Sequence, residues 1–463
     1  MGTTAQVGGT FPVTDAPAKA SGTLAYGTDL VLPGMLHVTL VLSARAHATI
    51  AGVDTAAALA LPGVVAVFDH RHNPPRRFCR YRLVPGQAGC IDDEQLFATV
   101  ARFVGDRVAA VVATSQAAAD AGARAVTVTY EDLTPVFDAN TALTDGAPVV
   151  HPGGNLVSSF DHRHGAGAPA ERIPADWVEM TTSVATQRLH HAAIEPHMAA
   201  ADIDASGLLT VWTTGQSVYG ARNVVAGLFD LPDHHVRVVK VPTGGSFGGK
   251  QEFILEPVVA LLTLTLRRPV RLVLSREQCL AATMVRPTQT TTMRTVATAA
   301  GRLQSVALDT LLDAGAYASS SPDYAEAMAH KLGRLYAMPS YWHSGRVAYT
   351  NTPVAGGFRG WGAPDVITSF ELHLAALADR LGIDQVALRR INLVRPGAID
   401  PTTGDSVGDA RIVDCLDRGA DLFDWANKSA RQAGTAGSVT ASALPLARTR
   451  TGCSLPCGRK RRR

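Results

Sequence analysis

The segment Gly244-Gly245-Ser246-Phe247-Gly248-Gly249-Lys250 contains four glycines in seven residues. It follows an alternating apolar run at 236–241, which predicts a strand, and it precedes an apolar run from Leu255, which predicts a helix. Glycines in such a turn let the backbone approach an anion closely and direct N–H groups toward it. Because glycine loses much conformational entropy on folding, this density predicts a ligand-binding loop rather than a plain turn.

The same segment has the Gly-x-x-x-x-Gly-Lys spacing of a phosphate-binding loop. That motif continues with a Ser or Thr that holds Mg²⁺, whereas this chain has Gln251. Phe247 adds a bulky ring that a phosphate cradle does not need but that suits a flat ligand. Because the spacing matches, a P-loop protein that binds ATP or GTP is kept as an alternative interpretation.

A second loop rich in glycine and aromatic residues runs from Phe358 to Pro364 and leads into a predicted helix. Trp361 offers a second aromatic face, Arg359 offers a charged or backbone donor, and Pro364 suits the first turn of the helix. Gln216 follows a strand-like run, where its amide can donate to an oxo ligand or cap a turn. Paired with the first loop, these residues indicate a pocket.

A cluster at 190–197 has the composition of a metal site but not its spacing. It holds His190, His191, Glu195 and His197, and it lacks the His-Glu-x-x-His pattern of a zinc helix. Pro196 favours an extended segment, so we expect a polar patch near the mouth of a pocket rather than zinc.

Composition describes a globular protein with several cores. Of 463 residues, 46% are hydrophobic and 18% are charged, and we find no run of 18 apolar residues. The N-terminal stretch has no secretory pattern, and the six cysteines show no C-x₂-C pair, so we expect a reducing, cytoplasmic setting and no membrane. Nine of the basic residues lie after position 426, so the remaining chain has 34 basic and 40 acidic residues and offers no nucleic-acid footprint.

We expect five segments along the chain. The first domain alternates strands, at about 35–42, 64–68, 107–113 and 125–130, with a short helix capped by Asp54 and a helix opened by Ser115. A long helical stretch at 364–394 is expected to break at Gly382 and to restart at Asp384. The expected segments are a flexible lead-in (1–20), an α/β domain (21–142), a linker (143–175), a strand-rich domain that ends in helices (176–426) and a basic, disordered tail (427–463).

Taken together and in order, these segments resemble the molybdopterin-binding large subunit of the xanthine dehydrogenase and aldehyde oxidase family. The resemblance covers about residues 20–426. The stretches that carry it are Tyr26 with Asp29, 33–36, 47–50, 61–67, 104–109, Glu195-Pro196, Gly215-Gln216, 244–250 and 358–364. It implies an α+β fold, in which an N-terminal α/β hammerhead domain precedes the first, incomplete part of the molybdenum cofactor-binding domain.

The resemblance also implies the chemistry and the site. It implies an oxidoreductase that oxidises an aldehyde or an N-heterocycle, xanthine-like or purine-like, with water as the oxygen source. The cofactor is a molybdenum pterin, as a mononucleotide or as a dinucleotide such as the cytosine form. An iron–sulfur small subunit with [2Fe-2S] clusters and an FAD-binding medium subunit are the implied partners, since no iron–sulfur cysteine run occurs here.

Individual roles carry over by position in the motifs. Gln216 would lie near the oxo ligand of the metal, with Phe247 and Arg359 also near molybdenum but not as ligands to it. Phe247 would also face substrate. The remaining cofactor contacts would come from Gly244, Gly245, Gly248 and Gly360, and the remaining substrate contacts from Gln251 and Trp361.

The chain also departs from the family pattern. Gln251 stands where purine-oxidising members carry a substrate-binding Glu, with Glu252 adjacent. The family's second Gly-Gln-Gly cofactor loop and its catalytic Glu are absent, so no catalytic base is assigned. We therefore expect a truncated or frameshifted chain that is inactive alone. A non-catalytic scaffold that docks an iron–sulfur subunit is a further alternative.

Overall fold

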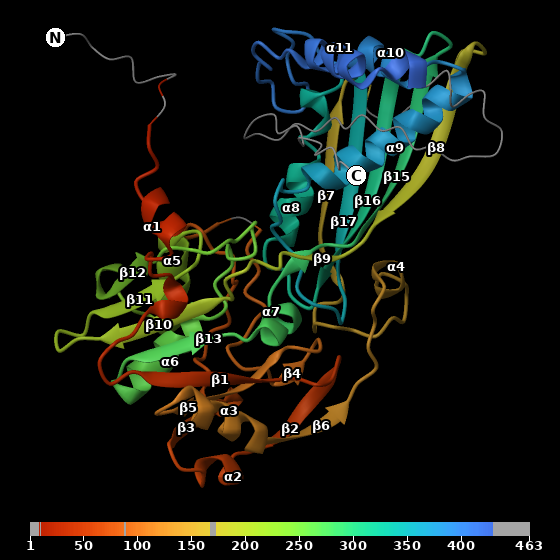
Figure 1. The fold of residues 1–463 in the computed structure, drawn as a ribbon. Helices are drawn as coiled ribbons and strands as arrows, with labels where there is room; N and C mark the ends of the chain where they lie inside the picture. Colours follow the sequence, from red (N-terminus) through yellow and green to blue (C-terminus); the bar gives the residue numbers. More distant parts are fainter. Residues whose placement is uncertain (1–8, 10, 88, 167–172, 429–463) are drawn as a thin grey trace, which may run out of the picture.

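The computed structural model describes residues 9, 11–87, 89–166 and 173–428, which form two lobes, each built on one large sheet (Figure 1). Residues 1–8 and 10 of the expected lead-in and nearly all of the basic tail lie outside the described residues. Helix α1 (Ala16–Ser21) occupies the end of the expected lead-in and buries no residue. No helix in the described part of the chain has the length and apolar character needed to cross a membrane.

The first lobe contains a seven-stranded sheet that joins both expected domains. β1 (Leu36–Leu42) pairs antiparallel with β5 and parallel with β13, so the hammerhead strands continue directly into the strands of the second domain. The two regions also share one buried core, because apolar residues of both pack into a single cluster. The sheet order is β12 (Val236–Lys240), β11 (Leu209–Thr213), β10 (Met198–Ile203), β13 (Val270–Val273), β1, β5 (Arg107–Ala113) and β3 (Val64–Asp69).

Local sequence explains several elements of this lobe. β5 is a continuous run of Val and Ala after Arg107, and all seven of its residues are buried, as suits a strand enclosed on both faces. Ser115 caps α3 (Gln116–Ala125), as predicted. Thr55, rather than the predicted Asp54, is the cap residue of α2 (Ala56–Leu59), although Asp54 still accepts a bond from Ala56 N at 2.9 Å. The remaining elements here are α5 (Val218–Phe229), α6 (Glu256–Leu266), α7 (Arg276–Ala282) and a small sheet of β4 (Val100–Ala101), β2 (Ala48–Asp54) and β6 (Thr127–Asp132).

The second lobe is a five-stranded sheet with helices on one face (Figure 1). The linker interpretation of 143–175 is wrong for part of that segment, because β7 (Leu156–His164) pairs with β17 at the sheet edge. Its polar sequence hides the strand, since most of its residues are exposed or half-buried. The sheet order is β7, β17 (Ser340–Tyr349), β16 (Leu303–Gly315), β15 (Gln289–Thr298) and β8 (Trp177–Thr186).

The helices of this lobe follow the sequence prediction. α9 (Ala363–Leu381) ends at Gly382, whose φ of 66° is a left-handed conformation that glycine adopts freely. Asp384 then caps the next helix by accepting a bond from Ala387 N at 2.9 Å. The others are α8 (Ser321–Met328), α10 (Gln385–Asn392) and α11 (Ile412–Phe423). The short helix α4 (Ala139–Ala142) packs against β16 and β17, and β9 (Leu189–His190) pairs with β14 (Val285–Arg286).

The second lobe is expected to lose stability in mild acid through His373 on α9. This ring is buried and pairs with Thr182 Oγ1 at 2.7 Å, and burial lowers its pKa to about 4. An unfolded histidine titrates near pH 6.5, so the unfolded chain binds the extra proton as the pH falls from about 6.5 to 4. The free energy of unfolding should therefore fall by up to about 3 kcal/mol over this window. Urea unfolding at pH 7.5 and 5 measures it, and H373N should flatten the slope while H234N, at an exposed position, should not.

Candidate functional site

The two glycine-rich loops meet in space although more than a hundred residues separate them. Arg359 N donates to Phe247 O at 2.9 Å, which ties the second loop to the first. Gly248 faces Gly357 so closely that an added Cβ would lie 2.6 Å from Gly357 O. The backbones can approach this way only because side chains are missing at the contact. The predicted pairing of the loops is therefore present in the structure.

The aromatic residue of each loop is held in an unusual conformation. Phe247 has φ of 55° and Trp361 has φ of 45°, a left-handed region that bulky residues rarely adopt. Phe247 is also 48% exposed, although its ring is large and apolar. Backbone strain persists where the surroundings enforce it, and it gathers at ligand-binding sites. Two strained aromatic residues on facing loops fit a pocket for a flat ligand.

Glu195 is the anchor of the first loop. It is buried, and its carboxylate accepts bonds from Gly244 N at 2.7 Å, from Lys250 Nζ at 2.8 Å and from Gly27 N at 3.1 Å. One side chain thus holds both ends of the loop and joins them to the N-terminal region. Glu195 and Lys250 lie in separate segments of the sequence, and their pairing was not predicted.

The phosphate-loop alternative does not fit this geometry. Lys250 is buried against Glu195 rather than free to meet a phosphate, and burial lowers the pKa of its amine. In a phosphate-binding loop the helix begins at the lysine, but α6 begins at Glu256. The loop therefore does not present its anion-binding N–H groups at a helix N-terminus.

Gln216 lies at the loop rather than at a helix cap. Its side chain is exposed, and its Oε1 accepts a bond from Ser246 Oγ. Its backbone N donates to Lys250 O at 2.8 Å, so both ends of the residue contact the first loop. Ser217, and not Gln216, caps α5 by accepting from Gly220 N at 3.0 Å.

Gln251 and its neighbour Glu252 point to different surroundings. Gln251 lies beside the second loop, since a Cβ on Gly357 would meet its Oε1 at 2.8 Å and the Trp361 ring at 2.3 Å. Glu252 is buried instead, with Ser320 Oγ donating to it at 2.8 Å, and burial raises its pKa. The adjacent acid therefore does not stand in for the family's missing Glu, because it faces the protein interior.

The histidine cluster at 190–197 supports the loops and does not form a metal site in the described residues. His191 Nε2 pairs with Gly357 O at 2.9 Å, and His197 Nε2 pairs with Gly249 O at 2.7 Å. His190 Nε2 pairs with Cys279 O at 3.0 Å. Each ring thus contacts a backbone carbonyl, one of them within the first loop and one immediately before the second.

A set of side chains that packs against Phe358 and Trp361 was not predicted from the sequence. The Arg286 guanidinium lies 4.2 Å from the Phe358 ring, whose other neighbour is the stacked His191 ring at 4.3 Å. Tyr81, from the N-terminal region, and Tyr324, from α8, both lie with their rings 5.7 Å from that of Trp361. Residues from two distant segments therefore pack against Trp361, and single-sequence motifs carry no signal for such contacts.

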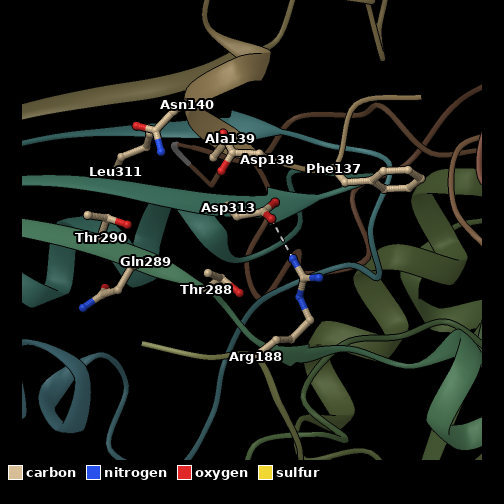
Figure 2. A pocket seen from close by; sticks show the side chains of 10 residues that line it. All are labelled: Phe137, Asp138, Ala139, Asn140, Arg188, Thr288, Gln289, Thr290, Leu311 and Asp313. Atoms are coloured by element: carbon tan, nitrogen blue, oxygen red, sulfur yellow. Dashed lines mark hydrogen bonds and ion pairs between the residues drawn. The ribbon is translucent and has the colours of Figure 1, made fainter. Parts of the chain in front are cut away.

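A pocket elsewhere contains none of the predicted site residues. It lies between α4 and strands β15 and β16, where Asp313 accepts a bond from Arg188 at 2.7 Å (Figure 2). The glycine-rich loops, and not this pocket, bring together the residues that the sequence singled out.

Comparison with known proteins identifies the class. Residues 150–393 match the model of a molybdopterin cofactor-binding domain, and residues 21–134 match that of the aldehyde oxidase and xanthine dehydrogenase a/b hammerhead domain. The chain therefore belongs to the xanthine dehydrogenase and aldehyde oxidase family of molybdopterin-binding oxidoreductases, in the region of its molybdopterin-binding large subunit. The predicted α+β fold, a hammerhead domain followed by cofactor-binding structure, is confirmed.

Relatives differ in how much of their length the chain matches. It is 33% identical over 424 residues to the putative xanthine dehydrogenase molybdenum-binding subunit of Escherichia coli strain K12, covering 90% of this chain and 56% of that one. It is 33% identical over 385 residues to the nicotinate dehydrogenase large molybdopterin subunit of Eubacterium barkeri, covering 83% and 88%. The solved aldehyde oxidoreductase from Desulfovibrio gigas matches with a TM-score of 0.83 and 29% identity, over 91% of this chain and 47% of that one. The chain thus spans about half the length of several relatives and most of another.

Proposed function

We propose that this chain supplies one wall of a molybdenum hydroxylase site that oxidises an aldehyde or an N-heterocycle, with water as the oxygen source. The observation that carries the proposal is the contact between the two loops, which sets strained Phe247 and Trp361 on facing backbones. The hammerhead part would be 21–142 and the cofactor-binding part 176–426. Residues outside the matched region, in a longer chain or a partner, would complete the site.

The cofactor would be a molybdenum pterin, which supplies the two-electron redox chemistry when bound. The backbone of 244–248 and of Arg359-Gly360 would hold it, because these turns are exposed or half-buried and a ligand could reach their N–H groups. Gln216, an exposed amide fixed by the first loop, would donate toward the metal's oxo ligand. Phe247 and Trp361 would enclose a planar substrate, and the Gln251 amide would hydrogen-bond its edge. An iron–sulfur subunit and an FAD subunit would accept the electrons.

The assembled enzyme tests this proposal through F247A. We expect the molybdenum content per chain to stay within about twofold of wild type, while KM for an aromatic heterocycle rises roughly three- to tenfold from the lost ring contact. The matched control is F137A, since Phe137 is similarly exposed but lines the separate pocket. Unchanged KM in F247A would contradict the substrate role, and a complex that assembles without pterin would favour a scaffold.

A further inference from the structure

Three metal-binding side chains lie together on the second lobe, away from the glycine-rich loops. His162 is on edge strand β7, Glu326 is on α8, and His330 lies two residues beyond the end of that helix. One ligand atom from each falls within 4.8 Å of the other two. No other group of three such residues comes together in this way within the described ranges.

The donor set and its geometry suit a borderline divalent metal. Two imidazoles and one carboxylate are ligands that Zn²⁺ prefers, and tetrahedral ligands at about 2.1 Å from the metal lie roughly 3.4 Å apart. His162 Nε2 and Glu326 Oε1 are 2.8 Å apart, and the His162 and His330 rings are 4.7 Å apart between centroids. Modest rotations of the side chains, of which Glu326 is exposed, would bring all three to a common centre.

An ion pair alone leaves part of this cluster unsatisfied. If His162 and Glu326 formed only a surface pair, His330 Nδ1 would stay buried without a hydrogen-bond partner in the described structure, as it is now. Such a nitrogen is costly unless something binds it.

We infer that His162, Glu326 and His330 form a site for a divalent transition-metal ion such as Zn²⁺, with water in the remaining position. The ion would fasten the end of α8 to the edge of the five-stranded sheet. Because α8 also carries Tyr324, which contacts Trp361, the metal would brace the wall behind the proposed substrate site. It is distinct from the molybdenum pterin and needs no redox chemistry.

Zinc titration of the full-length chain, free of any affinity tag, tests the site by calorimetry. The cysteines other than the buried Cys79 and Cys279 are alkylated first so that their thiols cannot bind the metal. We expect one Zn²⁺ per chain, and a loss of affinity of about 100-fold or more in H162A/H330A, since even outer-shell changes cost 10- to 100-fold. The matched control is H234A/H235A, which removes two exposed imidazoles from another segment and should bind zinc as wild type does.

A second variant keeps the test decisive if the double histidine variant fails to fold. E326Q preserves the shape of an exposed side chain and removes its charge, so the fold should persist while zinc affinity falls about tenfold. Co²⁺ should also give a visible absorption band in wild type that E326Q shifts. Absence of zinc binding in wild type, or unchanged affinity in E326Q and the folded double variant, would overturn the inference.

Discussion

Replacing Glu195 by alanine is expected to lower the free energy of unfolding by about 3 to 5 kcal/mol, the range measured when one partner of a buried ion pair is removed. The change leaves Lys250 Nζ buried without its carboxylate and removes the acceptor for Gly244 N and Gly27 N. Both ends of the first loop lose their anchor at once. Urea unfolding at pH 7.5 measures the loss.

Two comparisons separate the buried charge from other effects of E195A. E195A/K250M removes the stranded ammonium as well, so it should be more stable than E195A, although the backbone N–H groups stay unpaired. D161N breaks the exposed pair with Arg163 and should cost less than about 1 kcal/mol. A value for E195A as small as that for D161N would show that the loop is not held by this carboxylate.

The fold could be predicted where local chemistry decides it. The break between α9 and α10 follows from a glycine in the left-handed conformation and an Asp cap, and both are readable in the sequence. β7 was missed because its exposed, polar residues lack alternation, and only pairing with β17 makes it a strand. The joining of β1 to β13 was missed for the same reason, since no local pattern specifies a partner far along the chain.

The candidate site could likewise be predicted only in part. Glycine density and aromatic residues pointed to both loops, and the resemblance placed them in one pocket. The pairing of Glu195 with Lys250 and the packing of Arg286 on Phe358 depend on tertiary contacts, so a single sequence carries no sign of them. Glu252 is a case in which the sequence misleads. Its position next to Gln251 suggested that the two residues share a role, but Glu252 is buried.

Replacing Gly248 by alanine is expected to reduce the molybdenum pterin bound per chain in the assembled enzyme by about tenfold or more, since misplacing such a site by about 1 Å can cost a hundredfold. Its φ of 98° is unfavourable for alanine, and the new Cβ would lie 2.6 Å from Gly357 O and 3.0 Å from Gly357 C. Neither atom is the end of a flexible side chain, so one backbone must move. Gly357 O also pairs with His191, so the displacement would spread through the contact between the loops.

A control is needed to distinguish the effect of backbone strain at the substituted glycine from the effect of pushing the two loops apart. G207A is the matched control, because Gly207 has φ of 87° but nothing lies within 4 Å of an added Cβ. It should cost about 1 to 2 kcal/mol in stability and leave the pterin content unchanged. G357A offers a graded case, since its Cβ would meet side-chain atoms of Trp361 and Gln251 instead of backbone. Pterin content should therefore fall in the order G207A, G357A, G248A, and a G248A enzyme that is folded and fully loaded would show that cofactor binding does not depend on the two loops touching.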